Sequence, residues 1–213
     1  MRLWESRAFE PHQEVGRLVV VEGDPGAGKT SAIASASRST DVFVVPQLDH
    51  VTSPLRVVPY DPSYPEDWYV AAERARQAEI RRLLGLGYRV LQDRGVLSTL
   101  AFVYASTFRS HEPRRVRRLL RCLAEGQALI RPDALVIMNV DVEVGLQRRA
   151  VFRDSEHYRV WFDPEFLTRY QAFYRVLAPR ALTCPTAIID TSSLSFDAVS
   201  EELVPCIFGL DGR

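Results

Sequence analysis

Lysine is nearly absent from this chain of 213 residues. Lys29 is the single example, and all the other basic side chains apart from histidine are arginine. Arginine carries its charge on a planar fork, whereas lysine carries a compact point charge on a flexible stem, so a position that needs lysine cannot use arginine. We therefore expect Lys29 to lie at a site that requires a compact positive charge.

Net charge is also missing, because Lys plus Arg and Asp plus Glu each total 27 residues. A chain without an overall field has no general attraction for nucleic acid or for an anionic membrane. No apolar run approaches the roughly 20 residues that a membrane-spanning helix needs. The N-terminal segment contains Glu5, Glu10 and Glu14, so it lacks the apolar core of a signal peptide. These absences predict a cytoplasmic protein with no nucleic acid and no membrane among its partners.

Cysteine is scarce, with only Cys122, Cys184 and Cys206 in the chain. Their number is odd and no two have CxxC spacing, which argues against a disulfide framework and against a zinc cluster. Apolar residues make up 46% of the chain and charged residues 25%, values typical of a globular protein. The length suits a single domain over residues 1–213.

What the chain does contain is a regular alternation of short β-branched runs and longer helical segments. The expected strands are residues 17–22, 41–46, 88–92, 134–140 and one that includes 187–189. The expected helices are residues 29–37, 66–86, 97–106, 113–129, 142–153, 164–177 and 197–207, and residues 51–65 are expected to form a loop. This alternation indicates an α/β, three-layer fold with a five-stranded parallel sheet flanked by helices, where ligands bind at the carboxyl ends of the strands.

The most specific pattern lies between the first expected strand and the first expected helix. It has the form G-x-x-x-x-G-K-[ST], and with the residue that follows it comprises Gly23, Asp24, Pro25, Gly26, Ala27, Gly28, Lys29, Thr30 and Ser31. The glycines let successive N–H groups point inward, and the helix presents its positive end to the same anion. We predict that Lys29 reaches the β and γ phosphates of ATP while the Thr30 hydroxyl binds Mg²⁺. The alternative is a chance match of a glycine-rich turn.

A carboxylate ends the third expected strand. Asp93 follows an apolar run beside the phosphate loop, so it is placed to bind hydrated Mg²⁺. The alternative is that Asp93 caps the following helix or forms an ion pair with Arg94.

Four separate segments of the chain resemble one family of kinases. They are Val21-Glu22-Gly23, Asp93-Arg94 followed by Ser98, Pro132 to Ile137 followed by Asp141, Arg148 and Arg149, and Ile189 to Ser192. Over most of the chain they resemble the thymidylate kinase and deoxynucleoside kinase group of P-loop kinases. This resemblance implies the P-loop NTPase fold, an Asp93 that helps to hold Mg²⁺, and an Arg94 that contacts phosphate or orients the substrate. It also implies a short arginine-bearing lid, at about residues 148–160, that closes on the donor.

Two arginines of this lid are expected to act together. Arg149 and Arg153 are four residues apart and are predicted to share one helix face beside Arg148. Such a face can neutralise charge on a phosphoryl group during transfer. The alternative is a solvated helix in which Asp154 and Glu156 are ion-pair partners.

The sequence is compatible with two classes of acceptor. Transfer to a sugar hydroxyl usually needs a carboxylate base, whereas a nucleoside monophosphate offers an oxygen that is already anionic. Deoxynucleoside kinases carry a Pro-Glu step after the second strand, but this chain has Pro46-Gln47, and a glutamine cannot act as the base. Asp49 lies on the same side of an extended chain and could take that role. The Arg-Glu-Pro step of thymidylate kinases is absent as well.

Further residues border the acceptor pocket by the same resemblance: Trp68, Tyr69, Arg76 and Phe102. The aromatic rings could stack on a base, and Arg76 could pair with a carbonyl or a phosphate. For Trp68 and Tyr69 the alternative is simple packing. The basic run at residues 113–121 is interpreted as one amphipathic helix with a solvated basic face rather than as a nucleic-acid site.

The sequence therefore predicts an ATP- and Mg²⁺-dependent phosphotransferase acting on a nucleoside or nucleoside monophosphate by in-line attack on the γ-phosphate. One alternative is a kinase for another hydroxyl, such as an antibiotic or a specialised metabolite, and another is a nucleotide-binding regulator. A Ras-like switch is disfavoured, because the chain has no second lysine for an Asn-Lys-x-Asp step. The oligomeric state is open between a monomer and a homodimer.

Overall fold

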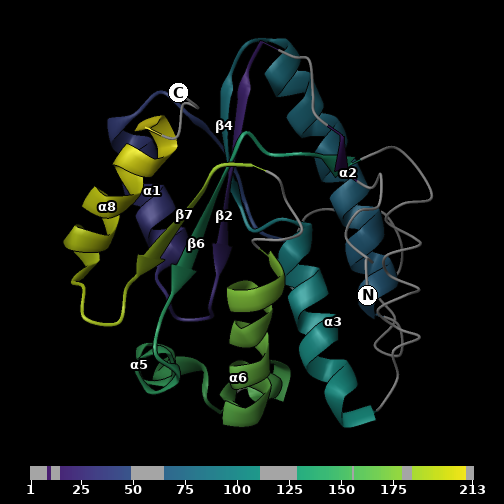
Figure 1. Cartoon of the computed structure of the whole chain (residues 1–213), viewed down its shortest axis with the longest axis vertical. Coiled ribbons are helices and arrows are strands. Elements are labelled where there is room, and N and C mark those ends of the chain that lie inside the picture. Colours follow the sequence, from purple (N-terminus) through teal and green to yellow (C-terminus); the bar gives the residue numbers. More distant parts are fainter. Residues whose placement is uncertain are drawn as a thin grey trace.

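The computed structural model describes residues 9–10, 15–48, 65–110, 129–154, 156–178 and 184–209. At their centre is a five-stranded parallel sheet with the strand order β3-β4-β2-β6-β7 (Figure 1). The strands are β2 (Arg17–Gly23), β3 (Phe43–Val45), β4 (Arg89–Asp93), β6 (Ala134–Asn139) and β7 (Thr186–Asp190). The predicted five-stranded α/β sheet is confirmed.

Strand β2 lies at the centre of the sheet and shows how the core is divided. Leu18 and Val20 pack into the core on one face, whereas Val19 and Val21 pack into the core on the other. Successive side chains of a strand point to opposite faces, so an uninterrupted apolar run requires cover on both sides.

Helices provide that cover (Figure 1). Helices α1 (Lys29–Ser39) and α8 (Phe196–Gly209) cover one face, and α2 (Pro65–Gly85), α3 (Val96–Ser110) and α6 (Pro164–Ala172) cover the other. A π-helical turn, η3 (Phe173–Leu177), continues α6. These elements confirm five of the predicted helices, with ends that differ by a few residues. No helix in the described part of the chain is long and apolar enough to cross a membrane.

A second, two-stranded sheet corrects one prediction. Strand β1 (Phe9–Glu10) pairs in parallel with β5 (Leu129–Ile130). The helix predicted at residues 113–129 therefore does not include Leu129, and residues 113–128 lie outside the described ranges, as does the predicted loop up to residue 64. Two residues form too short a pattern to predict a strand from periodicity.

The lid region corrects another prediction. Helix α5 (Val142–Arg148) ends well before the expected end at residue 153, because the backbone of Arg149 leaves the helical region (φ −106°, ψ 8°). Two short 3-10 helices follow, η1 (Ala150–Phe152) and η2 (Glu156–Phe162). Val151 and Phe152 are exposed. Helices in proteins are stabilised mainly by packing of an apolar face, so nothing extends α5 through this exposed segment.

Candidate active site at the phosphate loop

The loop between β2 and α1 contains three glycines in left-handed backbone conformations: Gly23 (φ 123°), Gly26 (φ 84°) and Gly28 (φ 85°). A Cβ atom at Gly23 would lie 2.1 Å from the carbonyl oxygen of Met138, and one at Gly26 would lie 2.6 Å from that of Gly145. Strand β6 and helix α5 therefore approach the loop so closely that only glycine fits at these two positions.

Helix α1 begins directly at this loop. Gly28 is its N-cap residue and no described side chain caps the helix. The N–H groups of a first helical turn have no partner within the helix, and they lie at the positive end of the helix dipole. Ser31 is exposed in this turn. The strand, loop and helix thus have the arrangement that the motif predicted for phosphate binding.

Lys29 is folded back into the loop. Its side chain is buried, and its Nζ atom donates a hydrogen bond to the backbone oxygen of Asp24. Burial, followed by the nearby charge of Arg94, lowers the pKa of Lys29 well below its ordinary value of 10.5. An anion bound at the loop would compensate both effects, because it favours the charged form of the lysine.

Thr30 and Asp93 meet beside the loop. The Thr30 hydroxyl donates to Asp93 Oδ2 over 2.7 Å. Asp93 is buried, and its Oδ1 atom has no hydrogen-bond partner among the described residues. A hydroxyl next to a carboxylate oxygen with spare capacity fits the oxygen ligands that Mg²⁺ prefers, so the two residues suit this ion. The described hydrogen bond of the Asp93 side chain is with Thr30, which favours the metal interpretation over a helix cap.

Arg94 follows Asp93 in a left-handed conformation (φ 57°) and reaches across the site. Its Nη1 atom donates to the backbone oxygen of Gly23 over 3.0 Å and to the hydroxyls of Ser98 and Tyr170, each over 3.1 Å. Its Nε atom donates to Gln47 Oε1 over 3.1 Å. The guanidinium therefore lies between the phosphate loop and the segment after β3.

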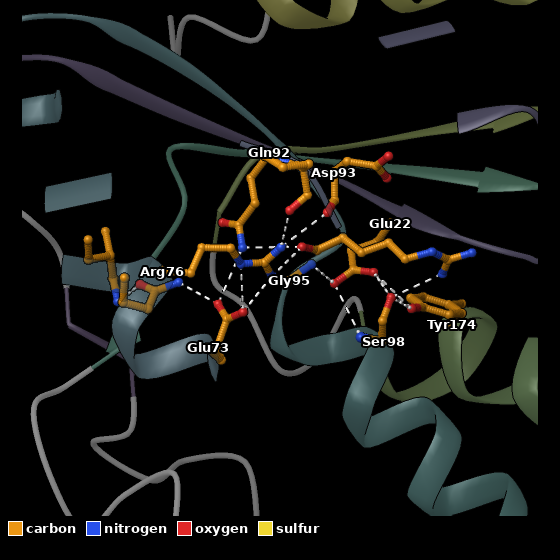
Figure 2. A network of polar contacts seen from close by, with 12 residues as sticks. Glu22, Glu73, Arg76, Gln92, Asp93, Gly95, Ser98 and Tyr174 are labelled. Atoms are coloured by element: carbon orange, nitrogen blue, oxygen red, sulfur yellow. Dashed lines mark hydrogen bonds and ion pairs between the residues drawn. The ribbon is translucent and has the colours of Figure 1, made fainter. Parts of the chain in front are cut away.

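Glu22 belongs to one of the segments that carry the resemblance, but the sequence predicted no role for it in the site. It is fully buried and accepts hydrogen bonds from Gly95 N over 2.8 Å, from Tyr174 Oη over 2.9 Å and from the Ser98 hydroxyl (Figure 2). Burial raises the pKa of Glu22, although the hydrogen bond from Ser98 opposes the shift. A glutamate at the end of an otherwise apolar strand was the available signal.

The lid arginines are arranged differently from the prediction. Arg148, not the expected pair, reaches the loop, and it donates to Gly26 O over 3.4 Å and to Thr191 O over 2.8 Å. Arg149 donates to Trp161 O over 3.3 Å and is not on a shared helix face with Arg153, which is exposed. The early end of α5 is the physical reason, since it breaks the four-residue spacing.

Comparison with known proteins identifies the group to which these features belong. A thymidylate kinase of Halalkalibacterium halodurans is 28% identical over 208 residues, which cover 90% of this chain and 96% of the relative. A probable thymidylate kinase of Thermoplasma volcanium is 30% identical over 136 residues, which cover 62% of this chain and 70% of the relative. The chain belongs to the thymidylate kinase family. No protein-family model matches it.

Solved structures agree with the fold of this thymidylate kinase family member. The thymidylate kinase of Candida albicans has a TM-score of 0.68 at 19% identity, over 88% of this chain and 89% of its own. The deoxyadenosine kinase of M. mycoides has a TM-score of 0.66 at 15% identity, over 87% of this chain and 95% of its own. At these identities the likeness confirms the P-loop kinase fold.

The acceptor side of this thymidylate kinase family member is only partly described. Asp49 lies outside the described residues. Trp68 is buried, and its ring forms a T-shaped pair with that of Tyr69 at a centroid distance of 5.0 Å, which agrees with packing. Phe102 packs on the rings of Trp161 and Phe166, each at 5.5 Å.

Arg76 differs most from its predicted role. It is buried, and its hydrogen bonds go to protein atoms of α2, of the last residue of β4 and of the segments that follow β3 and β4. The geometry therefore favours a role other than direct pairing with the acceptor.

Proposed function

We propose that this kinase transfers the γ-phosphoryl group of ATP to the phosphate of a nucleoside monophosphate, that thymidine monophosphate is the first acceptor to test, and that the reaction needs Mg²⁺. Two curated relatives carry the name thymidylate kinase, which supports this class of acceptor. The deoxyadenosine kinase structure contains the products dCMP and dCDP, so both acceptor classes occur on this fold.

One observation carries the choice between the classes. Arg94 Nε donates to Gln47 Oε1 over 3.1 Å, and Gln47 occupies the position where, by resemblance, deoxynucleoside kinases carry a glutamate base. An amide cannot accept the proton of a hydroxyl group, whereas a phosphate acceptor requires no such base because its oxygen is already anionic. A guanidinium beside the amide suits that phosphate, since arginine binds phosphate through paired N–H groups.

The donor side follows from the phosphate loop. The N–H groups of the first turn of α1 and the ammonium group of Lys29 would bind the β and γ phosphates. Thr30 and Asp93 would hold Mg²⁺, which neutralises phosphate charge when it is bound. Arg148 lies between the loop and the Thr191 backbone, so it is the lid arginine that we assign to the donor.

On the acceptor side, Arg94 would orient the incoming phosphate so that its oxygen attacks the γ-phosphorus in line with the departing ADP. Tyr69 and Phe102 are half-buried and stay candidates for the border of the base pocket. Arg149 and Arg153 would take part only after a rearrangement of the lid.

The test is a panel of acceptors with ATP and Mg²⁺, in which release of ADP is measured. Thymidine and deoxyadenosine represent the hydroxyl class, and thymidine, deoxyadenosine, deoxycytidine and deoxyguanosine monophosphates represent the phosphate class. We expect kcat/KM for a monophosphate to exceed that for any nucleoside by about a hundredfold or more, because Gln47 stands where a hydroxyl acceptor would need a carboxylate base. Efficient phosphorylation of nucleosides alone would overturn the proposal.

The variant Asp49→Asn separates the two classes further. If the acceptor is a monophosphate, this variant should retain turnover within about threefold of the wild type, because no base is needed. A loss of about a hundredfold or more would assign the base to Asp49 and an acceptor hydroxyl to the reaction.

A further inference from the structure

A buried network on α2 holds the turn that carries Asp93 and Arg94 (Figure 2). Arg76 Nη1 donates to Pro46 O over 2.8 Å and to Asp93 O over 3.3 Å. Its Nη2 atom donates to Arg94 O over 2.6 Å. Arg76 thus connects the carbonyl groups at the carboxyl ends of β3 and β4, which are the strand ends on the proposed acceptor side.

Glu73 completes the network from the preceding turn of the same helix. It forms a buried ion pair with Arg76 through Oε2, and its Oε1 atom accepts from Gln77 over 2.7 Å and from Gln92 over 3.3 Å. Burial of an ion pair is unfavourable unless its groups are hydrogen-bonded, so a buried pair is weak evidence for added stability. Both oxygens of Glu73 have partners, so the carboxylate holds the guanidinium in one orientation.

The hydrogen bonds of Arg76 match its capacity. A guanidinium has five N–H groups in a fixed planar fork. Here Nε donates to Glu73, Nη1 to two backbone carbonyls, and Nη2 to Glu73 and to Arg94 O. A ligand would have to replace one of these five contacts in order to bind Arg76.

The Arg94 turn needs such support. A left-handed conformation is unfavourable for a residue with a Cβ atom, and it persists where neighbours hold it. On one side Arg76 binds the Arg94 carbonyl, and on the other Glu22 accepts the N–H of Gly95. Between these two anchors, the Arg94 guanidinium points to the phosphate loop and Gln47.

We propose that Arg76, held by Glu73, is a positioning residue for phosphoryl transfer, which acts through Arg94 by holding the backbone turn at Asp93 and Arg94, and which does not touch the substrate. This inference rests on the proposed function, because it gives Arg94 the role of orienting the reacting phosphate. It replaces the direct contact with the acceptor that was predicted for Arg76.

A double-mutant cycle tests the proposal. The variants Arg76→Gln and Arg94→Ala and the double variant are assayed with ATP and the best monophosphate acceptor. If Arg76 acts through Arg94, we expect Arg76→Gln to lower kcat about tenfold or more, and the double variant to be no worse than Arg94→Ala alone. Losses that multiply, or a raised acceptor KM at unchanged kcat, would overturn the positioning role, because they indicate an independent contact with the acceptor.

A matched control lies on the same helix. Arg82 also pairs with a glutamate three residues earlier, Glu79, but this pair is exposed (59% and 52%). We expect Arg82→Gln to retain kcat and KM within about twofold, because exposed pairs contribute little. A loss equal to that of Arg76→Gln would mean that any break in α2 has this effect, which overturns the proposal.

Two further variants keep the test decisive. Arg76→Lys keeps the charge but lacks the fork, so it should not restore kcat. If Arg76→Gln does not fold, as judged by its melting curve, the cycle is run with Glu73→Gln, which keeps the side-chain shape and removes the charge. The same pattern of losses is expected, and multiplicative losses again refute the positioning role.

Failure of the proposed function and failure of the positioning role give different results. If no monophosphate is phosphorylated, the proposed function fails, and the cycle is then measured on ATP hydrolysis, where water is the acceptor. A double variant that hydrolyses ATP no more slowly than Arg94→Ala alone would support the role of Arg76 for any acceptor. Losses that multiply would overturn it.

Discussion

Replacement of single glycines by alanine can separate phosphate binding from backbone strain. Gly28, at the start of α1, and Gly87, after α2, have nearly the same backbone angle, with φ of 85° and 84°. A Cβ atom at either position would meet no described atom within 4 Å. The two residues therefore differ in location and hardly at all in local strain or space.

The expected effect on stability follows from this similarity. An alanine in the left-handed region costs about 1–2 kcal/mol, and the lower entropy of its unfolded chain returns about 0.4–1 kcal/mol, so the net loss is about 1 kcal/mol. For a domain of this size that loss lowers the melting temperature by about 2–4 °C. Gly28→Ala and Gly87→Ala should both show this decrease.

The affinity for ATP should decrease in Gly28→Ala and not in Gly87→Ala. Relief of the strain at Gly28 rotates the backbone, which turns the Lys29 N–H away from a bound phosphate. A hydrogen bond to a charged group contributes about 1.5–3 kcal/mol, so its loss should weaken ATP binding about tenfold to a hundredfold. Titration calorimetry of ATP with Mg²⁺, together with melting curves for both variants, measures the two effects separately.

A third variant checks the steric part of the reasoning. At Gly26 a Cβ atom would overlap the backbone of Gly145, whose oxygen would lie 2.6 Å away. Gly26→Ala should therefore lose a further ~1–3 kcal/mol of folding stability. Equal ATP affinity in Gly28→Ala and Gly87→Ala would refute the assignment of the loop, and equal melting temperatures in all three variants would refute the packing argument.

Three further predictions concern single side chains. Lys29→Ala should reduce phosphoryl transfer by about a hundredfold or more while the melting curve stays cooperative, and near-normal turnover would contradict its role. Asp93→Asn should raise the Mg²⁺ concentration required for half-maximal rate by about tenfold, because it removes the charge and keeps the acceptor for Thr30; an unchanged requirement would count against the metal site. Burial raises the pKa of Glu22 above its ordinary value of 4.5, so the unfolded chain loses this proton first as the pH increases. The melting temperature of Glu22→Gln relative to wild type should therefore rise as the pH increases above 4.5, and a constant difference would contradict the shift.

Part of the site could be predicted because its signals are local. The phosphate loop is one continuous segment in which glycine spacing, the following helix and the single lysine all agree. Asp93 was predicted for a similar reason, because a carboxylate that ends an apolar strand lies at the ligand-binding edge of the sheet.

The role of Arg76 could not be predicted in the same way. Its residue type and its place on α2 are compatible with a substrate contact, and only the positions of Pro46 and Arg94 reveal that its N–H groups bind backbone carbonyls. The prediction for the lid was wrong for a related reason, since the spacing of Arg149 and Arg153 predicts a shared face only if the helix continues.

By itself, the amino-acid sequence determined the order of strands and helices, the glycine-rich loop and the position of Lys29, since backbone preferences and apolar periodicity act over a few neighbouring residues. Only the tertiary structure decided which polar groups meet. Glu22 and Tyr174 are 152 residues apart, and Arg94 and Tyr170 are 76 apart, yet each pair is hydrogen-bonded. These contacts depend on how the helices pack on the sheet and on the backbone angle at Arg94, and no short-range pattern contains that information.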